Sequence, residues 1–213
     1  MPGAPNRPPE STPPPPPPPV LAEPPDRKVL RRLAPSRVAL RLDAWKGAPS
    51  AELLTPFDKA ESAFDAGDFP GALNALDLLS VRFAEPRWPS LPEPFRRLRV
   101  PIPAPMPPHW DPDHALAPAE REAKRARREA DDQLALAAGT VAWAAEHSVD
   151  LNDVGPAVEE ARALLATEGV GAPFYERIDR VWDAVRTRVP RPKGPVGRAP
   201  PPAAPPPAEA GEA

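Results

Sequence analysis

Residues 120–147 read EREAKRARREADDQLALAAGTVAWAAEH and belong to the longest stretch of the chain without proline. Their first half, 120–132, is almost entirely charged, and opposite charges recur four residues apart, where they are neighbours on a helix surface. Their second half, 133–145, has apolar residues on two sides of a helix, so such a helix needs neighbours on both sides. We expect one helix of about 28 residues and about 40 Å, whose C-terminal half lies at the centre of a small helical domain.

The two apolar sides of this helix can be written as two stripes. The first consists of Leu134, Ala137, Ala138, Val141 and Ala145, and the second of Leu136, Thr140, Trp143 and His147. The many alanines and Gly139 keep this half of the helix thin, so that other helices can approach closely. Trp143 is therefore expected to be buried.

Composition limits what a chain of 213 residues can do. The net charge of −3 argues against general binding to polyanions, and the absence of cysteine excludes disulfides, thiolate metal sites and a catalytic thiol. No run approaches the ~18–20 apolar residues of a membrane span, and the polar N-terminus lacks the apolar region of a secretion signal. We expect a cytoplasmic protein that does not enter a membrane, with one domain or two small ones.

The chain contains 39 prolines, which concentrate in three segments and so divide it. Two of these segments, at the ends of the chain, cannot bury enough apolar surface to fold, and we expect both to be disordered. Such arms act either as ligands for aromatic grooves or as spacers. The predicted organisation is an arm at 1–25, a helical domain at 26–189 and a tail at 190–213, with N-terminal helices in 26–85, a proline-rich strap in 86–118, and the long helix and a helical pair in 119–189.

The strap at 86–118 is too apolar for a free linker, although its prolines exclude regular structure. Its large apolar side chains are Trp88, Leu91, Phe95, Leu98, Val100, Ile102, Met106 and Trp110. Disordered segments are poor in such residues, so we expect an extended segment that lies across the helices, with its arginines at 96–99 exposed. Trp88 and Phe95 either belong to the core or form a binding surface, and both alternatives remain open.

Residues 26–46 form the basic part of the chain. Seven basic side chains are accompanied only by Asp26 and Asp43; the seven are Arg27, Lys28, Arg31, Arg32, Arg37, Arg41 and Lys46. We expect a short helix that Pro35 ends and a second helix that Ser36 caps. The arginines can serve as a docking strip for nucleic acid or an acidic protein surface, or they form a solvated helix face whose long side chains cover apolar neighbours.

Residues 57–83 have the pattern of a helix–turn–helix. Thr55 and Pro56 suit the start of the first helix, Gly67 ends it, and Asp68 caps the second. The predicted inward residues are Phe57, Ala60 and Phe64 on the first helix, and Ala72, Leu73, Leu76, Leu79 and Phe83 on the second.

The run Gly67-Asp68-Phe69 followed by Ala72-Leu73 resembles the turn and the second-helix start of a tetratricopeptide hairpin. The resemblance covers only 57–83. Where that family carries Trp, Gly and Tyr in its first helix, this chain has Pro56, Ala60 and Ala63, and the strap leaves no second copy at the ~34-residue period. The resemblance implies a single repeat-like hairpin and, by analogy, a protein-binding role.

Two more helices are predicted after the long one. Asp153 suits the cap of a helix that runs to about Glu168, and Pro173 opens a last helix that Pro190 stops. Their apolar stripes are Val154, Val158, Ala161 and Leu165 on the first, and Phe174, Ile178, Val181, Trp182, Val185 and Val189 on the second. Trp182 is therefore expected to be buried. The pair carries net negative charge, opposite in sign to residues 26–46.

No motif in the sequence indicates a reaction. The stretch His109–His114, HWDPDH, has the residue types of a metal site, but its spacing fits no helical ligand face, so a solvated turn is favoured. No glycine-rich phosphate loop or nucleophile elbow occurs, and the pair Glu159-Glu160 has no apolar pocket to raise its pKa values. We expect no catalysis, no cofactor and no metal.

Together these observations predict an all-α fold: a small bundle of about six helices, with two helical hairpins around one long helix, a proline-rich strap and disordered proline-rich termini. The predicted function is a protein–protein interaction or scaffolding module, and the predicted partner is another protein. The alternative is an accessory protein that binds RNA or DNA through basic segments at 27–41, 96–99 and 124–128. The residues predicted to contact a partner are Trp88, Phe95, Arg27, Arg31 and Arg32.

Overall fold

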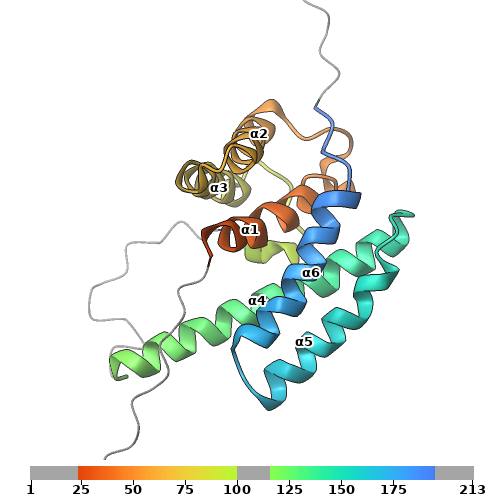
Figure 1. The fold of residues 1–213 in the computed structure, drawn as a ribbon. Coiled ribbons are helices and arrows are strands. Elements are labelled where there is room, and N and C mark those ends of the chain that lie inside the picture. Colours follow the sequence, from red (N-terminus) through yellow and green to blue (C-terminus); the bar gives the residue numbers. More distant parts are fainter. Residues whose placement is uncertain (1–23, 100–115, 195–213) are drawn as a thin grey trace, which may run out of the picture.

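The structure is a computed structural model that describes residues 24–99 and 116–194. These residues form α-helices and short 3₁₀-helices and no strand, which confirms the predicted all-α fold (Figure 1). Residues 1–23, 195–213 and 100–115, which hold most of the predicted arms and part of the strap, lie outside the described residues. The six α-helices of the described residues are α1 (Pro25–Ala39), α2 (Ala51–Asp65), α3 (Phe69–Ala84), α4 (Pro118–Glu146), α5 (Gly155–Thr167) and α6 (Ala172–Arg188), and their 3₁₀-helices are η1 (Asp43–Trp45), η2 (Phe95–Leu98) and η3 (Asn152–Val154).

Helix α1 occupies the centre of the molecule. It lies between the hairpin of α2 and α3 on one side and the group of α4, α5 and α6 on the other (Figure 1). From Val29 to Leu40 every residue except Arg32 is buried. The sequence predicts the C-terminal half of the long helix at the centre; that half does contribute to the core, but the helix buried on all sides is the basic one. Its burial is possible because carboxylates from other helices reach its arginines.

Helix α1 continues through Pro35, so the predicted break at this residue is wrong. Pro35 has no backbone N–H to offer the carbonyl oxygen of Arg31, and that oxygen instead accepts a hydrogen bond from Nε2 of Gln133, 3.3 Å away on α4. Ser36 does not cap a helix, since its Oγ donates to the carbonyl oxygen of Arg32 at 2.7 Å. A contact from a distant helix supports α1 where local signals predict its end.

The turn between α2 and α3 has the predicted chemistry. Gly67 has a φ of +76°, a left-handed conformation that favours glycine, and the N–H of Asp68 donates to the carbonyl oxygen of Ala63 at 2.8 Å. The carboxylate of Asp68 accepts a hydrogen bond from the N–H of Gly71 at 3.0 Å, so the predicted cap of α3 is confirmed.

The start of α2 differs from the prediction. The helix begins at Ala51, and Pro56 lies inside it rather than at its first position. The carbonyl oxygen that Pro56 leaves without a donor belongs to Glu52, an exposed residue of the first turn, where water can form the missing bond. The inward residues follow the prediction: Phe57, Ala60, Ala72, Leu76, Leu79 and Phe83 are buried, and Phe64 and Leu73 are partly buried.

Residues 86–99 lie across α1 and α4. Leu91, Phe95 and Leu98 are buried, and η2 contacts both helices. Gly139 of α4 allows this close approach, because a Cβ atom at that position would lie 2.4 Å from Cγ of Pro94. The strap therefore packs against the thin part of α4. The sequence analysis predicts that another helix packs there.

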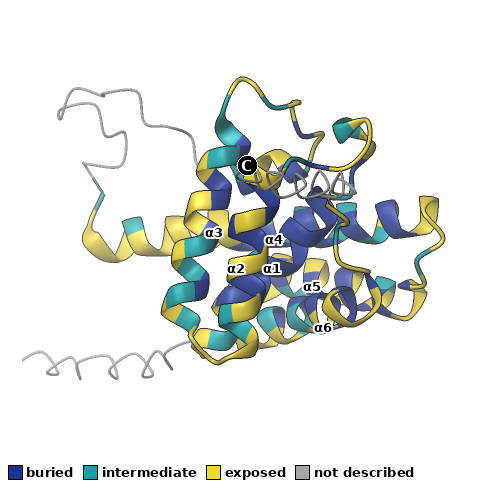
Figure 2. Ribbon diagram, turned by 90° about the horizontal axis from the view of Figure 1, so that it is seen from above, coloured by how far each residue is buried: buried dark blue, intermediate teal, exposed yellow. Residues whose placement is uncertain are grey.

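Helices α5 and α6 pack with their predicted stripes inward, and every residue of both stripes is buried. Trp182 is fully buried and Trp143 is 5% exposed, which confirms both predictions. On α4 the two sides differ. Of the stripe with Leu136, the residues Leu136, Thr140 and Trp143 are buried and His147 is exposed. In the other stripe only Ala137 is buried, Val141 is partly buried and Ala145 is exposed. The N-terminal half of α4 is largely exposed and projects beyond the other helices (Figure 2).

Candidate protein-binding site

The outer side of α3 carries two exposed apolar side chains. Leu78 is 47% exposed and Val81 is 41% exposed, and within the described residues these two are the exposed large hydrophobic side chains. Three residues apart on a helix, they are neighbours, and helical spacing places them opposite the buried side that holds Leu76 and Leu79. Helix α3 thus packs one side against the core and offers a small apolar surface on the other.

Asn74 and Glu85 extend this surface by one turn at each end. With Leu78 and Val81 they are spaced four, three and four residues apart, and so form one line along the helix, which we call the α3 row. The row spans about 16 Å at 1.5 Å per residue. An apolar middle with polar ends is typical of surfaces that bind other proteins.

Charged side chains lie at the end of the α3 row and on both sides of it, and each of them takes part in an ion pair. Glu85 accepts hydrogen bonds from Arg82 at 2.7 Å and from Arg87 at 2.6 Å, and Arg87 also pairs with Glu52 of α2. The hydrogen bonds from Arg87 and Arg82 lower the pKa of Glu85, so its carboxylate is ionised at neutral pH. On the opposite flank, the side chain of Asp77 is 63% exposed although it pairs with an arginine of α1 at 2.7 Å.

The two aromatic residues predicted to contact a partner lie in different surroundings. Phe95 is 3% exposed and packs in the core, so it offers no surface to a partner. Trp88 is partly buried, with the guanidinium of Arg87 4.7 Å from its ring centre. Its Nε1 is buried and has no hydrogen-bond partner among the described residues. Through Arg87, which also pairs with Glu85, Trp88 is connected to one end of the α3 row.

The arginines predicted to contact a partner bond to acidic residues of the protein itself. Nη1 of Arg27 lies 2.8 Å from Asp183 of α6. Arg31 is 5% exposed and makes two hydrogen bonds to Asp179, of 2.7 and 3.0 Å. Arg32 is the partner of Asp77 on α3. Arg27 and Arg31 thus reach α6, whereas Arg32 reaches α3, so the three side chains do not form one exposed strip.

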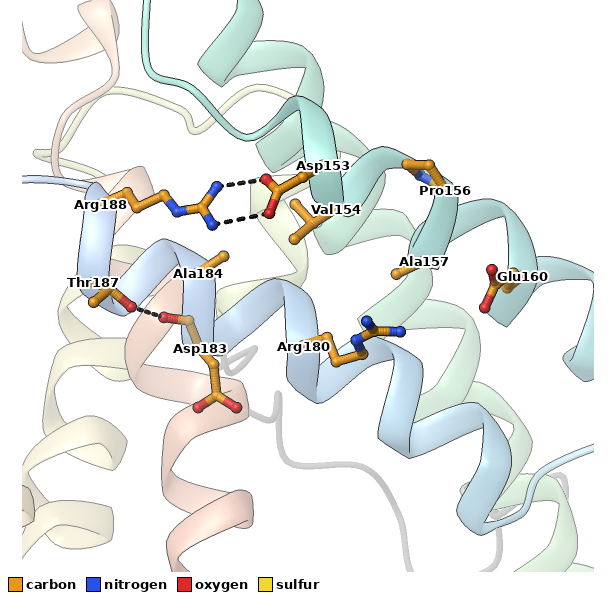
Figure 3. Close-up of a pocket in the computed structure, with 10 residues that line it drawn as sticks. All are labelled: Asp153, Val154, Pro156, Ala157, Glu160, Arg180, Asp183, Ala184, Thr187 and Arg188. Carbon is orange, nitrogen blue, oxygen red and sulfur yellow. Dashed lines mark hydrogen bonds and ion pairs between the residues drawn. The ribbon is translucent and has the colours of Figure 1, made fainter.

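A groove of about 500 Å³ lies between α5 and α6 (Figure 3). At one end Arg188 holds both carboxylate oxygens of Asp153, with Nη2 2.9 Å from Oδ2. Asp153 therefore does not cap α5 as the sequence predicts. Further along, Glu160 pairs with Arg177 at 2.6 Å, and Arg180 extends from α6 toward α5 (Figure 3).

The electrostatics of this groove do not favour acid–base chemistry. A carboxylic acid that donates a proton near neutral pH needs a raised pKa. The hydrogen bond from Arg188 instead lowers the pKa of Asp153, and Asp153 in turn raises that of Arg188. Both groups stay charged and hold each other, which makes this end of the groove a structural contact between η3 and α6.

Within the described residues, no group of three or more His, Cys, Asp or Glu side chains is placed to hold a metal ion; the stretch 109–114 lies outside them. No helix in the described parts of the chain is long and apolar enough to cross a membrane. Comparisons with protein-family models, with curated proteins and with solved structures found no match. The function must therefore be inferred from the protein's own surface.

Leu78 and Val81 are not among the residues that the sequence analysis predicts to bind, although the sequence contains a signal. The predicted inward stripe of α3 is complete without them, and helical spacing places both on the opposite side. Apolar residues one turn apart on the outer side of an amphipathic helix mark a candidate contact surface.

Proposed function

We propose that this protein is a protein–protein interaction module without catalytic activity, and that its partner docks on the α3 row. One observation carries the proposal: the exposed apolar pair Leu78 and Val81 lies at the centre of the row, on a helix whose inner side is fixed in the core. A few apolar anchors surrounded by polar residues supply most of the energy in many protein interfaces. The resemblance of the α2–α3 hairpin to a tetratricopeptide unit agrees with this role by analogy.

The alternative function, binding to RNA or DNA, has less support. Phosphate binding requires basic side chains that can face the nucleic-acid backbone. In the segment 27–41 the arginines described above bond to carboxylates. In the segment 96–99, Arg97 pairs with Asp132, and Nε of Arg99 donates to the carbonyl oxygen of Phe83 at 2.8 Å. A polyanion would have to displace these contacts.

Photo-crosslinking in the native cell tests the proposal. A photo-reactive residue at Asn74, which is exposed at one end of the row, should crosslink a protein. The crosslink should be lost when Leu78→Asp and Val81→Asp are added. The control places the same group at Glu122, an exposed residue on the projecting half of α4. Equal crosslinking at both positions, or crosslinks that nuclease treatment removes, would contradict the proposal.

A further inference from the structure

The groove between α5 and α6 has an apolar floor. The two helices face each other here with small side chains, Ala157 on α5 and Ala184 on α6, and Val154 also lines the groove. Val154 and Ala157 are 6% exposed and Ala184 is 8% exposed, so they lie at the bottom of the groove (Figure 3). The volume of about 500 Å³ falls within the range of about 300–1,000 Å³ that small-ligand sites occupy. The floor can therefore receive a short aliphatic group.

The rim of the groove contains three carboxylates, and each of them is engaged by an arginine. The pairs are Asp153 with Arg188, Glu160 with Arg177 at 2.6 Å, and Asp183 with Arg27 at 2.8 Å. Asp150, whose carbonyl oxygen accepts a hydrogen bond from Arg188 at 3.2 Å, does not line the groove. The three pairs contain as many positive as negative charges, so the carboxylates of the rim do not make the groove acidic.

Arg180 is the remaining charged residue of the lining. It lies four residues before Ala184, so both side chains point to the same side of α6, and its guanidinium extends toward α5 (Figure 3). Arg180 is exposed and forms no hydrogen bond or ion pair with another of the described residues. Its charge does reach Asp153, whose pKa is lowered first by the hydrogen bond from Arg188 and further by Arg180. With the three paired arginines, four positive charges face three negative ones, and the excess positive charge lies above the apolar floor.

An aliphatic monoanion matches both the floor and the excess charge. The planar guanidinium group of an arginine forms two parallel hydrogen bonds with a carboxylate. A phosphate dianion or a nucleic-acid strand would place further negative charges beside the carboxylates of the rim, which would repel them. An uncharged ligand would leave Arg180 without a partner.

We propose that the groove between α5 and α6 binds an aliphatic carboxylate, whose carboxylate group contacts Arg180 and whose hydrocarbon part contacts Ala157 and Ala184. The carboxylate belongs either to a free organic acid or to an acidic residue of a peptide, and the two sources share this chemistry. This binding site is independent of the proposed function, because the groove lies across α1 from the α3 row (Figure 1).

Titration of the isotope-labelled full chain with butyrate, followed by NMR at constant ionic strength, tests this site. The signals of Ala157, Arg180 and Ala184 should shift and saturate with butyrate, whereas the uncharged analogue butyramide should leave them in place. Arg180→Gln should weaken the binding of butyrate about two- to fivefold. Ala184→Leu should abolish it, because leucine fills the floor of the groove. Arg125→Gln, which removes an exposed arginine from α4, should have no effect.

A short peptide with one glutamate between two alanines, blocked at both ends, distinguishes the two sources of the carboxylate. Tighter binding of this peptide than of butyrate assigns the groove to an acidic peptide, and weaker binding assigns it to a free organic acid.

The proposed site would be overturned if butyrate produced no saturable shift, if butyramide bound equally well, or if Arg180→Gln left the affinity for butyrate unchanged. Tighter binding of methyl phosphate than of butyrate at the same signals would also overturn it, because a single excess charge disfavours a dianion. Circular dichroism checks the fold of each variant. Ala157→Val replaces Ala184→Leu if the leucine disturbs the fold, and it should weaken the binding of butyrate in the same way.

Discussion

The indole Nε1 of Trp182 donates a hydrogen bond of 2.9 Å to Oε1 of Gln133, and both side chains are buried. Through Nε2 the same amide donates to the carbonyl oxygen of Arg31, which Pro35 leaves without its usual helical donor. One buried polar side chain of α4 thus forms hydrogen bonds with both α6 and α1. A buried polar group without a partner costs about 1–3 kcal/mol, so this amide contributes substantially to the joint between three helices.

Gln133→Leu should therefore lower the free energy of unfolding by about 2–5 kcal/mol, because it leaves the Trp182 indole and the Arg31 carbonyl unpaired. Denaturant unfolding followed by circular dichroism measures the change. Pro35→Ala restores a backbone N–H that can donate to the carbonyl oxygen of Arg31. In the Gln133→Leu variant it should therefore raise the free energy of unfolding by about 1 kcal/mol more than the same substitution does in the parent protein. Strictly additive effects of the two substitutions would show that this hydrogen bond contributes nothing.

Gly139→Ala should destabilise the protein, although alanine is favoured over glycine in a helix by about 1 kcal/mol. The added Cβ would lie 2.4 Å from Cγ of Pro94, and overfilling a close contact costs about 1–3 kcal/mol. Gly155→Ala is the matched control, because its Cβ would meet no atom within 4 Å, and it should not reduce stability. Equal denaturation midpoints for the two variants would mean that residues 86–99 do not rest on α4.

The C-terminal boundary of the fold should lie after Arg191, not at Pro190 as the sequence predicts. Nε of Arg191 is 2.6 Å from Oε2 of Glu61, a carboxylate that is 1% exposed and also pairs with Arg37. Deleting 195–213 should leave the unfolding midpoint unchanged, whereas deleting 191–213 should cost about 1 kcal/mol, a modest value because Arg191 itself is largely exposed. Arg191→Gln in the full chain should reproduce the loss; equal midpoints for both truncations would contradict the role of this pair.

Tyr175 should ionise above its ordinary pKa of 10.0. Burial is the main cause of the raised pKa and Glu129 adds to it, while Arg31, 3.9 Å from the ring centre, acts in the opposite direction. Because the folded-state pKa is raised, the stability it contributes is present below about pH 10 and is lost as the pH rises through the folded value. As the chain has a single tyrosine, phenolate absorbance reports this group alone. A midpoint no higher than that in denaturant would contradict the burial of the ring.

Helices with one buried side could be predicted from the sequence, because the spacing of their apolar residues determines which side packs. Helix α6 is the clearest case, from Phe174 to Val189. Helix α1 could not be predicted in this way. The signal for a break at Pro35 is local, whereas the residue that compensates for it, Gln133, lies 102 residues from Arg31. The arginines of α1 suggest an exposed face in the sequence because their acidic partners lie on other helices, from 24 residues away for Glu61 to 156 for Asp183.

The candidate site was partly predictable for a related reason. Sequence spacing places Leu78 and Val81 outside the buried stripe of α3, so their exposure follows from the helix alone. The strap has no such period, and nothing local distinguishes Phe95 from Trp88. The difference depends on tertiary packing: Phe95 lies in the core against α1 and α4, whereas Trp88 is partly exposed beside Arg87.

The central position of α1 sets the order in which the protein can be assembled during synthesis. Asp179 and Asp183, the partners of Arg31 and Arg27, lie 148 and 156 residues further along the chain, so α1 leaves the ribosome long before α6 exists. The α2–α3 hairpin has contacts between neighbouring segments, which form early, and it can cover one side of α1 first. A chain released before α6 would hold α1 half covered, with arginines that lack their carboxylates. Such a fragment would be a substrate for chaperones and proteases rather than a smaller working domain.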